Sequence, residues 1–132
     1  AKLNGLTNIT TMQGDVFEVL RQFKRDGESF DTIILDPPAF CKSASEVKNA
    51  YKGYKDINIL AMKLVKNGGF LISSSCSHYM TFPLFQNMLR DAARESGKNA
   101  RIVEIRTQSG DHPSMLSTDE SLYLKFFVLQ IL

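Results

Sequence analysis

The chain has 132 residues, of which 43% are hydrophobic and 23% charged, and it carries a net charge of +2. This length suits one domain with a modest core, and the composition excludes the disordered and fibrous classes of protein. The near-neutral charge neither requires nor excludes a nucleic-acid partner. No apolar run approaches the length of a membrane span, so we expect no membrane segment. Two cysteines in unlike surroundings indicate a reducing cytoplasm rather than a disulfide framework.

The first predicted elements are a short strand at Ile9–Gln13 and a helix over residues 16–23. Asp15 directly precedes this helix and Glu18 follows three residues later, which is the spacing of a capping box. Apolar residues three and four apart within the helix share one face. The segment therefore predicts a strand followed by an amphipathic helix.

A second strand is predicted at Phe30–Leu35, whose nearly continuous apolar run suits a strand buried on both faces of a parallel sheet. Asp36, Pro37 and Pro38 end it, because proline lacks the N–H that a strand ladder needs. Open α/β sheets bind their ligands at the carboxyl ends of the strands. Asp36 is therefore predicted to lie at a ligand site.

The next helix has an apolar stripe over residues 57–64 and is predicted to end at Asn67, Gly68 and Gly69. Gly53 weakens the first part of this helix. A strand at Gly69–Ser74 follows, and Cys76 comes just after its carboxyl end. If this strand neighbours the one at 30–35, a carboxylate and a thiol face one cleft.

The last elements are a helix that begins near Thr81 and Pro83 and ends at Gly97, and strands at Arg101–Thr107 and Leu122–Leu132. A long loop separates these two strands. The alternation of strands and helices predicts an α/β fold with a parallel sheet and an antiparallel last strand.

Cys76 is the candidate nucleophile of the chain. A cysteine is most often an inert, buried small hydrophobe, and that interpretation applies to Cys76 as well. Cys76, however, lies at a strand end between Ser75 and Ser77, with His78 following, and a thiolate there can act as a nucleophile. Cys41 is the competing candidate, in the loop after the prolines.

Three further features have both a structural and a functional interpretation. Asp36 either caps a turn or, held by the rigid prolines, contacts a planar nucleobase. Asp15 either caps its helix or accepts a hydrogen bond from an adenine amino group. The segment Tyr51–Asp56 interleaves aromatic and basic residues, which suits stacking and phosphate contact with unpaired RNA, or simply a solvated helix face.

Four groups of residues, taken in order, resemble a known family. The family is that of the class I S-adenosylmethionine-dependent methyltransferases of the bacterial type that modify C5 of a cytosine in large-subunit ribosomal RNA. The Asp-Pro-Pro unit alone is common to many methyltransferases, whereas the complete set is specific. The matching residues are 36–40 (DPPAF), 53–58 (GYKDIN), 75–77 (SCS), and 111–113 (DHP) with 123–125 (YLK).

The resemblance implies a role for each matching residue. Cys76 would be the nucleophile that attacks C6 of the cytosine, and Asp36 an acid near N3. Asp15, Asp36 and Pro37 would bind the cofactor, S-adenosyl-L-methionine, and no metal is implied. The substrate would be 23S ribosomal RNA with an unpaired or flipped cytosine. Contacts with this RNA are implied for Pro38, Phe40, Tyr54, Lys55 and Asn58.

One residue departs from a related set of cytosine-5 RNA methyltransferases. Those enzymes have a cysteine directly after the Asp-Pro-Pro unit, where this chain has Ala39. The base that removes the C5 proton is therefore unassigned.

The resemblance further implies that residues 1–132 are the carboxyl-terminal part of a Rossmann-like domain, with strands 3 to 7 of a sheet ordered 3-2-1-4-5-7-6. The first strands and the glycine-rich cofactor loop are missing, so we expect negligible cofactor binding by this chain alone. The strand at 30–35 should expose an unpaired edge. We expect a rearranged first strand, a homodimer through that edge, or a bound complementary piece.

Two alternatives to cytosine-5 methylation stay open. The Asp-Pro-Pro unit followed by an aromatic residue also serves methylation of an exocyclic amino group, which needs no thiol. A non-catalytic RNA-binding module that uses the Tyr51–Asp56 segment is the second alternative; it would bind RNA without any dependence on a cofactor.

Overall fold

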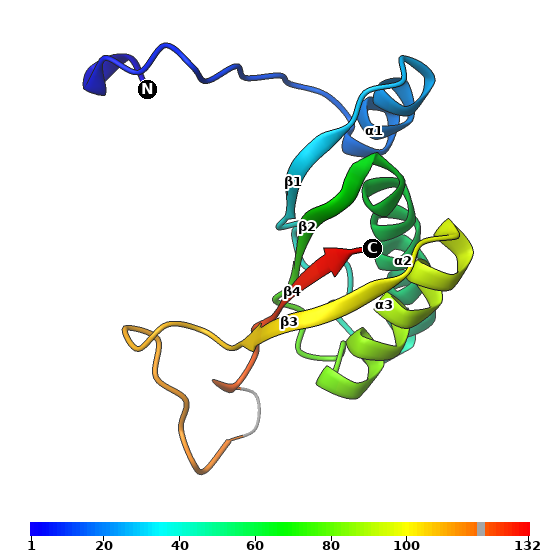
Figure 1. Ribbon diagram of the computed structural model, residues 1–132. Coiled ribbons are helices and arrows are strands. Elements are labelled where there is room, and N and C mark those ends of the chain that lie inside the picture. The colour runs from blue at the N-terminus through cyan, green and yellow to red at the C-terminus, as the bar shows by residue number, and fades with distance from the viewer. Residues whose placement is uncertain (119–120) are drawn as a thin grey trace.

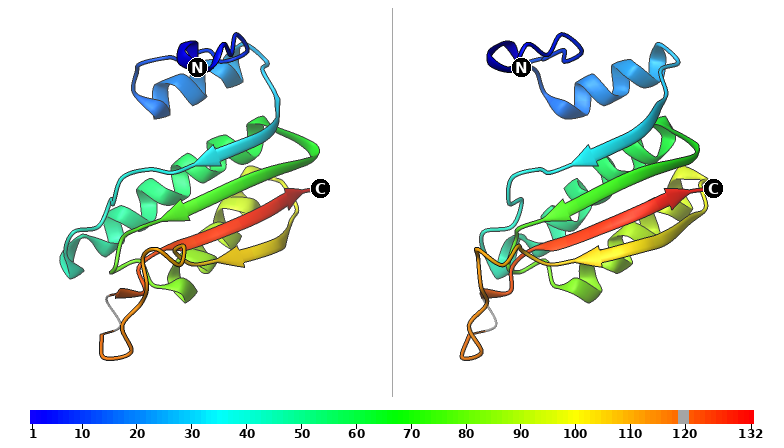
Figure 2. Two further views of the ribbon diagram at one scale, coloured as in Figure 1. Left: turned by 90° about the vertical axis from the view of Figure 1, so that its left-hand side faces the viewer. Right: turned by 60° about the vertical axis from the view of Figure 1, so that its left-hand side comes forward.

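The computed structural model describes residues 1–118 and 121–132, and in them a four-stranded sheet carries helices on one face (Figures 1 and 2). Short 3₁₀ turns at Lys2–Asn4 and Ala44–Glu46 precede the first and second helices. The predicted α/β class is therefore confirmed. The elements are α1 (Val16–Arg25), β1 (Phe30–Leu35), α2 (Val47–Leu64), β2 (Val65–Ser75), α3 (Phe82–Ser96), β3 (Ala100–Arg106) and β4 (Lys125–Ile131).

The strands follow the order β1-β2-β4-β3 across the sheet. β1 and β2 are parallel, whereas β4 is antiparallel to both of its neighbours, β2 and β3. This order matches strands 4-5-7-6 of the predicted sheet, and the last strand is antiparallel as predicted. Because β1 and β2 are parallel neighbours, their carboxyl ends meet at one edge of the sheet. The residues that follow these two strands are therefore brought close together.

The start of α1 and both ends of α3 follow signals in the sequence. The Asp15 side chain accepts a hydrogen bond from the Glu18 backbone N–H at 3.1 Å, as the capping pattern predicts. α3 has Pro83 in its first turn, where the missing N–H costs nothing, and it ends at Gly97 with a φ of 73°. These helix boundaries are confirmed.

The predicted junction between α2 and β2 is wrong. α2 ends at Leu64, and Val65 already has the extended backbone of β2, before the predicted stop at residues 67–69 (Asn-Gly-Gly). Val65 is buried and pairs with Phe30 of β1. Sheet pairing therefore overrides the glycine stop signal and begins the strand early.

The predicted burial of Phe30–Leu35 on both faces is also wrong. α2 and α3 cover one face of the sheet, and Figure 2 shows the other face of the strands without helices in front of it. Asp31, Thr32 and Ile34 of β1 are exposed, Ile34 by 65%. Among the described residues, β1 pairs with β2 alone, so the expected unpaired edge is present.

No strand forms at Ile9–Gln13, which corrects the first prediction. Figure 1 shows this segment running away from the sheet toward the N-terminus, and Ile9 and Met12 are exposed. A strand needs a neighbour for its backbone hydrogen bonds, and no described strand lies beside this segment. The short apolar pattern of this segment is therefore not enough to form a strand without a neighbouring strand.

The core lies between the sheet and helices α2 and α3. Along β4 every second side chain is buried, and these side chains are Lys125, Phe127, Leu129 and Ile131. The rings of Phe127 and Phe85 pack with centroids 5.7 Å apart. In the described part of the chain, no helix is both long enough and apolar enough to cross a membrane.

Candidate functional site

A pocket of about 550 Å³ lies where the carboxyl end of β1 meets the start of α1. It brings together all three residues to which cofactor contacts were assigned: Asp15, Asp36 and Pro37. Pro38 and Phe40 line it as well, and Ile57 contributes from α2. The walls are therefore mainly apolar and partly aromatic, with two carboxylates among them. We call this the carboxyl-edge pocket; its remaining lining residues are Gly14, Val16, Phe17, Ile34 and Leu35.

The Asp36 carboxylate is held by a residue of the neighbouring strand. The buried Ser74 hydroxyl of β2 lies 3.0 Å from Asp36 Oδ1 and 3.1 Å from the Leu35 carbonyl oxygen. This hydroxyl fastens the end of β1 to β2. The serine restricts the orientation of Asp36 while the rest of its carboxylate stays exposed.

The two cysteines have opposite environments. Cys76 follows β2 directly and is exposed, whereas Cys41 is only 3% exposed and its thiol donates to the Ser43 carbonyl at 3.1 Å. Cys76 is therefore the thiol that a substrate can reach. It does not line the carboxyl-edge pocket, although β1 and β2 are neighbours as predicted.

A buried cluster of hydroxyl groups holds the residues on either side of Cys76. The Tyr54 hydroxyl lies 2.9 Å from both Ser75 Oγ and Ser77 Oγ. Ser77 Oγ also accepts a hydrogen bond from the Cys41 N–H at 3.4 Å. This hydroxyl cluster (Tyr54, Ser75 and Ser77) connects α2, the end of β2 and the loop after the prolines. Sequence analysis identified the two serines but not their tyrosine partner.

Tyr54 and Asn58, to which RNA contacts were assigned, are buried in the fold. Tyr54 is 0% and Asn58 1% exposed, because the face of α2 that carries them packs onto the sheet. The Asn58 amide donates to the Tyr54 carbonyl at 2.7 Å. Lys55, on the outer side of α2, forms an ion pair of 2.8 Å with Glu95. The Tyr51–Asp56 segment is therefore partly core and partly surface.

Removing the Tyr54 hydroxyl should destabilise the chain. Tyr54→Phe leaves the buried hydroxyls of Ser75 and Ser77 without their partner, and we expect the free energy of unfolding to fall by about 1–3 kcal/mol. Urea denaturation followed by circular dichroism measures this change. Tyr79→Phe at an exposed position is the control and should leave the midpoint unchanged. Equal midpoints for the two variants would contradict a structural role of the cluster.

Lys125 is a buried cation of β4 that binds the loop after β2, a contact that sequence analysis missed. It is 2% exposed, and its Nζ donates to the carbonyl oxygens of Ser77 at 2.5 Å and Tyr123 at 2.6 Å. Burial lowers the pKa of Lys125 to about 8, while the nearby Cys76 acts in the opposite direction. Its place in β4, opposite Ser75 of β2, brings the amine to the Ser77 carbonyl.

The burial of Lys125 should make stability depend on pH. The folded chain releases this proton near pH 8, whereas the unfolded chain holds it up to about 10.5. Between these values the unfolded state binds more protons, so the free energy of unfolding should rise with pH, by up to about 3 kcal/mol. Urea denaturation at several pH values measures the slope. It should be flatter in Lys125→Met, and identical slopes would contradict this assignment.

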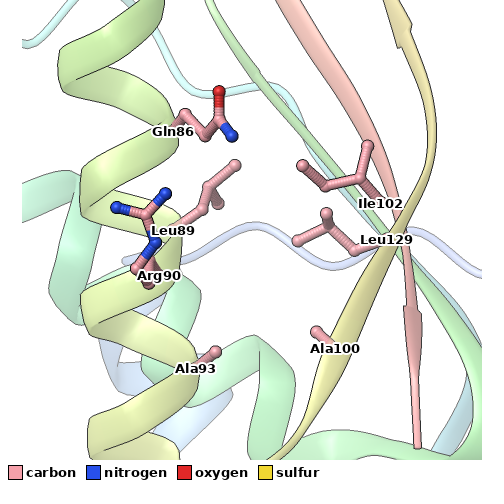
Figure 3. A pocket seen from close by; sticks show the side chains of 7 residues that line it. All are labelled: Gln86, Leu89, Arg90, Ala93, Ala100, Ile102 and Leu129. Atoms are coloured by element: carbon pink, nitrogen blue, oxygen red, sulfur yellow. The ribbon is translucent and has the colours of Figure 1, made fainter.

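A second, smaller pocket lies near the opposite edge of the sheet, on the face that the helices cover. It has a volume of about 170 Å³ between α3 and the strands β3 and β4 (Figure 3). Ala93 and Ile102 belong to its apolar walls, with Gln86 and Arg90 as its polar residues. Because β1 and β3 occupy opposite edges of the sheet, this pocket is separate from the carboxyl-edge pocket.

Comparison with known proteins gives strong similarity to one group of enzymes. No protein-family model matches the chain. It is 44% identical over 132 residues to ribosomal RNA large subunit methyltransferase I of Aeromonas salmonicida, covering 98% of this chain and 33% of that protein. The enzyme of the same name from Shewanella amazonensis is 42% identical over 131 residues, with the same coverage. The chain thus spans about one third of the length of these relatives.

Solved structures share the fold at low sequence identity. A SAM-dependent methyltransferase from Streptococcus mutans superimposes with a TM-score of 0.79 at 21% identity, covering 96% of this chain and 32% of that one. The structure of NSun6 from Pyrococcus horikoshii with SFG has a TM-score of 0.64 at 17% identity, covering 98% and 36%. The chain therefore has the fold of part of a class I methyltransferase domain. Almost its whole length is similar to a segment that makes up one third of ribosomal RNA large subunit methyltransferase I.

Proposed function

We propose that this chain is the carboxyl-terminal part of an RNA methyltransferase that acts on C5 of a cytosine in 23S ribosomal RNA. The observation that carries the proposal is the position of Asp36 and Cys76 after two neighbouring parallel strands. Asp36 lines a pocket with the features of a nucleoside site, and Cys76 presents an exposed thiol. The similarity to ribosomal RNA methyltransferases supports the class of substrate.

The carboxyl-edge pocket suits S-adenosyl-L-methionine. Its apolar walls include the flat surfaces of Pro37 and Phe40, against which a planar adenine can pack. Asp15 and Asp36 supply acceptors for the amino and hydroxyl donors of a nucleoside. When bound, the cofactor supplies an electrophilic methyl group on its sulfonium. Pro38 is exposed and Phe40 half-buried at the same pocket, where a flipped base can reach them.

The chemistry requires a thiolate because C5 of cytosine is a weak nucleophile. Attack of the Cys76 thiolate on C6 forms a C–S bond and moves electron density toward C5 and N3. An acid at Asp36 can donate a proton to N3 as this charge develops. C5 then takes the methyl group, and a base removes the C5 proton. The C–S bond breaks to return the Cys76 thiolate, and N3 gives its proton back to Asp36.

A trapped covalent complex tests this mechanism. The experiment uses a protein that contains this chain together with the further two thirds that its relatives have, incubated with cofactor and RNA carrying 5-fluorocytosine. Fluorine at C5 cannot leave as a proton, so the bond from Cys76 to C6 should persist and survive denaturing electrophoresis. Cys41→Ser should still form the complex and Cys76→Ser should not. Methyl transfer to ordinary RNA with no trapped complex would refute the covalent step.

The role of Asp15 in cofactor binding can be separated from its role as a helix cap. Asparagine caps helices as well as aspartate, so Asp15→Asn should preserve the bond to the Glu18 N–H and the stability of α1. It replaces the proposed carboxylate acceptor, and we expect about a tenfold or greater loss of cofactor affinity in the longer protein. Calorimetric titration measures the affinity. Unchanged affinity would remove Asp15 from the cofactor site.

A further inference from the structure

The backbone pairing of β1 with β2 stops just before the residues of the candidate site. The register between the two strands ends where Leu35 pairs with Ser73. The chain after β1 continues with Pro37 and Pro38, which have no N–H for a ladder bond. Pairing between these two strands therefore does not fix how the loop after the prolines lies relative to Cys76.

Side-chain hydroxyls of the hydroxyl cluster bind this loop instead. The Phe40 N–H donates to the Tyr54 hydroxyl at 3.5 Å, and the Cys41 N–H donates to Ser77 Oγ at 3.4 Å. Both hydrogen bonds are long, but the Phe40 and Tyr54 rings also pack against each other, with centroids 4.6 Å apart. The loop after the prolines is therefore attached to the cluster by two backbone groups and one aromatic contact.

The same hydroxyls hold the chain on both sides of Cys76. Ser75 and Ser77 are each 1% exposed, and each hydroxyl lies 2.9 Å from the Tyr54 hydroxyl. The Ser77 N–H also donates to Ser75 Oγ at 3.3 Å. The backbone around Cys76 is thus fixed at both neighbouring residues, while Cys76 itself is exposed.

Tyr54 is the shared partner of these two segments. Its oxygen accepts from Ser75 Oγ and from the Phe40 N–H, which leaves its own proton for Ser77 Oγ. Phe40 lines the carboxyl-edge pocket, whereas Cys76 does not. One buried hydroxyl therefore contacts both a residue of the pocket wall and the two neighbours of the thiol.

We propose that Tyr54 and Ser77 are positioning residues, which hold Cys76 at a fixed place relative to Phe40 and the carboxyl-edge pocket. They would set the approach of the sulfur to C6 of a base that lies against Phe40. A displacement of about 1 Å in a reacting group can cost about a hundredfold in rate. The role rests on the proposed function, because it is defined by the attack of Cys76 on a base.

A purely stabilising role for the cluster makes a different prediction, since folded variants would then react at the unmodified rate. Ser73→Ala is the matched control. Ser73 is also 1% exposed, but its hydroxyl has no hydrogen-bond partner among the described residues. Ser73→Ala therefore measures the loss of a buried serine hydroxyl as such, and Ser77→Ala measures the loss of the cluster.

The first test measures amide hydrogen exchange by NMR in the 132-residue chain. Ser77→Ala should speed exchange of the Cys41 amide by about tenfold or more, because this N–H loses its acceptor. Tyr54→Phe should have the same effect on the Phe40 amide, and Ser73→Ala should change neither. Unchanged exchange at Cys41 in a folded Ser77→Ala chain would overturn the proposal.

The second test measures how fast the longer protein forms the covalent complex with saturating 5-fluorocytosine RNA, and separately its affinity for that RNA. Ser77→Ala should slow complex formation by about tenfold or more and leave the affinity within about twofold. Ser75→Ala keeps the bond between Ser77 and the Cys41 N–H, so it should slow the reaction less. This second variant serves if Ser77→Ala does not fold. Ser73→Ala should react at the unmodified rate.

A folded Ser77→Ala protein that forms the complex at the unmodified rate would refute the positioning role. A loss confined to RNA affinity would refute it as well. Absence of the complex from the unmodified protein would instead reject the proposed function. The two failures are distinguishable, and hydrogen exchange tests the connection between the two segments without RNA or cofactor.

Discussion

Replacing Cys76 with alanine should abolish methyl transfer by the longer protein, with a loss of at least about a thousandfold in kcat. The physical reason is that C5 becomes nucleophilic only while C6 carries a covalently bound sulfur. Transfer of a labelled methyl group from the cofactor to ribosomal RNA measures the rate. Cys41→Ala should retain most activity, because the Cys41 thiol is buried and bonded to the Ser43 carbonyl.

The same measurement distinguishes the alternative functions. Methylation of an exocyclic amino group needs no thiol, so full activity in Cys76→Ala would favour that reaction. RNA binding that is independent of the cofactor, without any methyl transfer by the unmodified protein, would favour a binding module.

Gly69→Ala should be the most destabilising small substitution in the sheet, costing about 3 kcal/mol or more in the free energy of unfolding. A Cβ atom at Gly69 would lie 2.6 Å from the Asp31 carbonyl oxygen and 2.9 Å from the Lys66 carbonyl oxygen. Both are backbone atoms of β1 and β2, at the irregularity where the register between the strands shifts. A methyl group there must therefore push the two strands apart. Urea denaturation at constant pH measures the loss.

The neighbouring Gly68 provides a matched control. Its φ of 85° favours glycine, but a Cβ atom there would meet nothing within 4 Å. Gly68→Ala should therefore cost only about 1–2 kcal/mol of backbone strain, and Gly68→Asn less, because asparagine tolerates the left-handed region better. Equal losses for alanine at 68 and 69 would show that the close approach of the two strands is not what demands glycine at 69.

Several features of the fold could be predicted because their causes are local. Asp15 caps α1 through a contact three residues away, and Gly97 ends α3 by its own backbone conformation. The polar residues after β1 and β2 predict a ligand site at the carboxyl edge of the sheet, and Asp15, Asp36 and Pro37 line one pocket there. The predictions that were wrong, the α2–β2 junction at Val65 and the strand at Ile9–Gln13, lie where pairing between strands decides the local structure.

The sequence by itself determined where the strands end and which polar residues follow them, because turn-forming prolines and helix caps act over a few positions. Tertiary structure alone decided which side chains hold the residues on either side of Cys76. Tyr54 reaches Ser77 across 23 residues and Lys125 reaches the Ser77 carbonyl across 48. Such contacts depend on strand order and register, which bring distant segments together through packing that no short pattern records. For this reason Tyr54, predicted to bind RNA, is a buried hydrogen-bond partner of Ser75 and Ser77, and Lys125 is a buried donor to the Ser77 carbonyl.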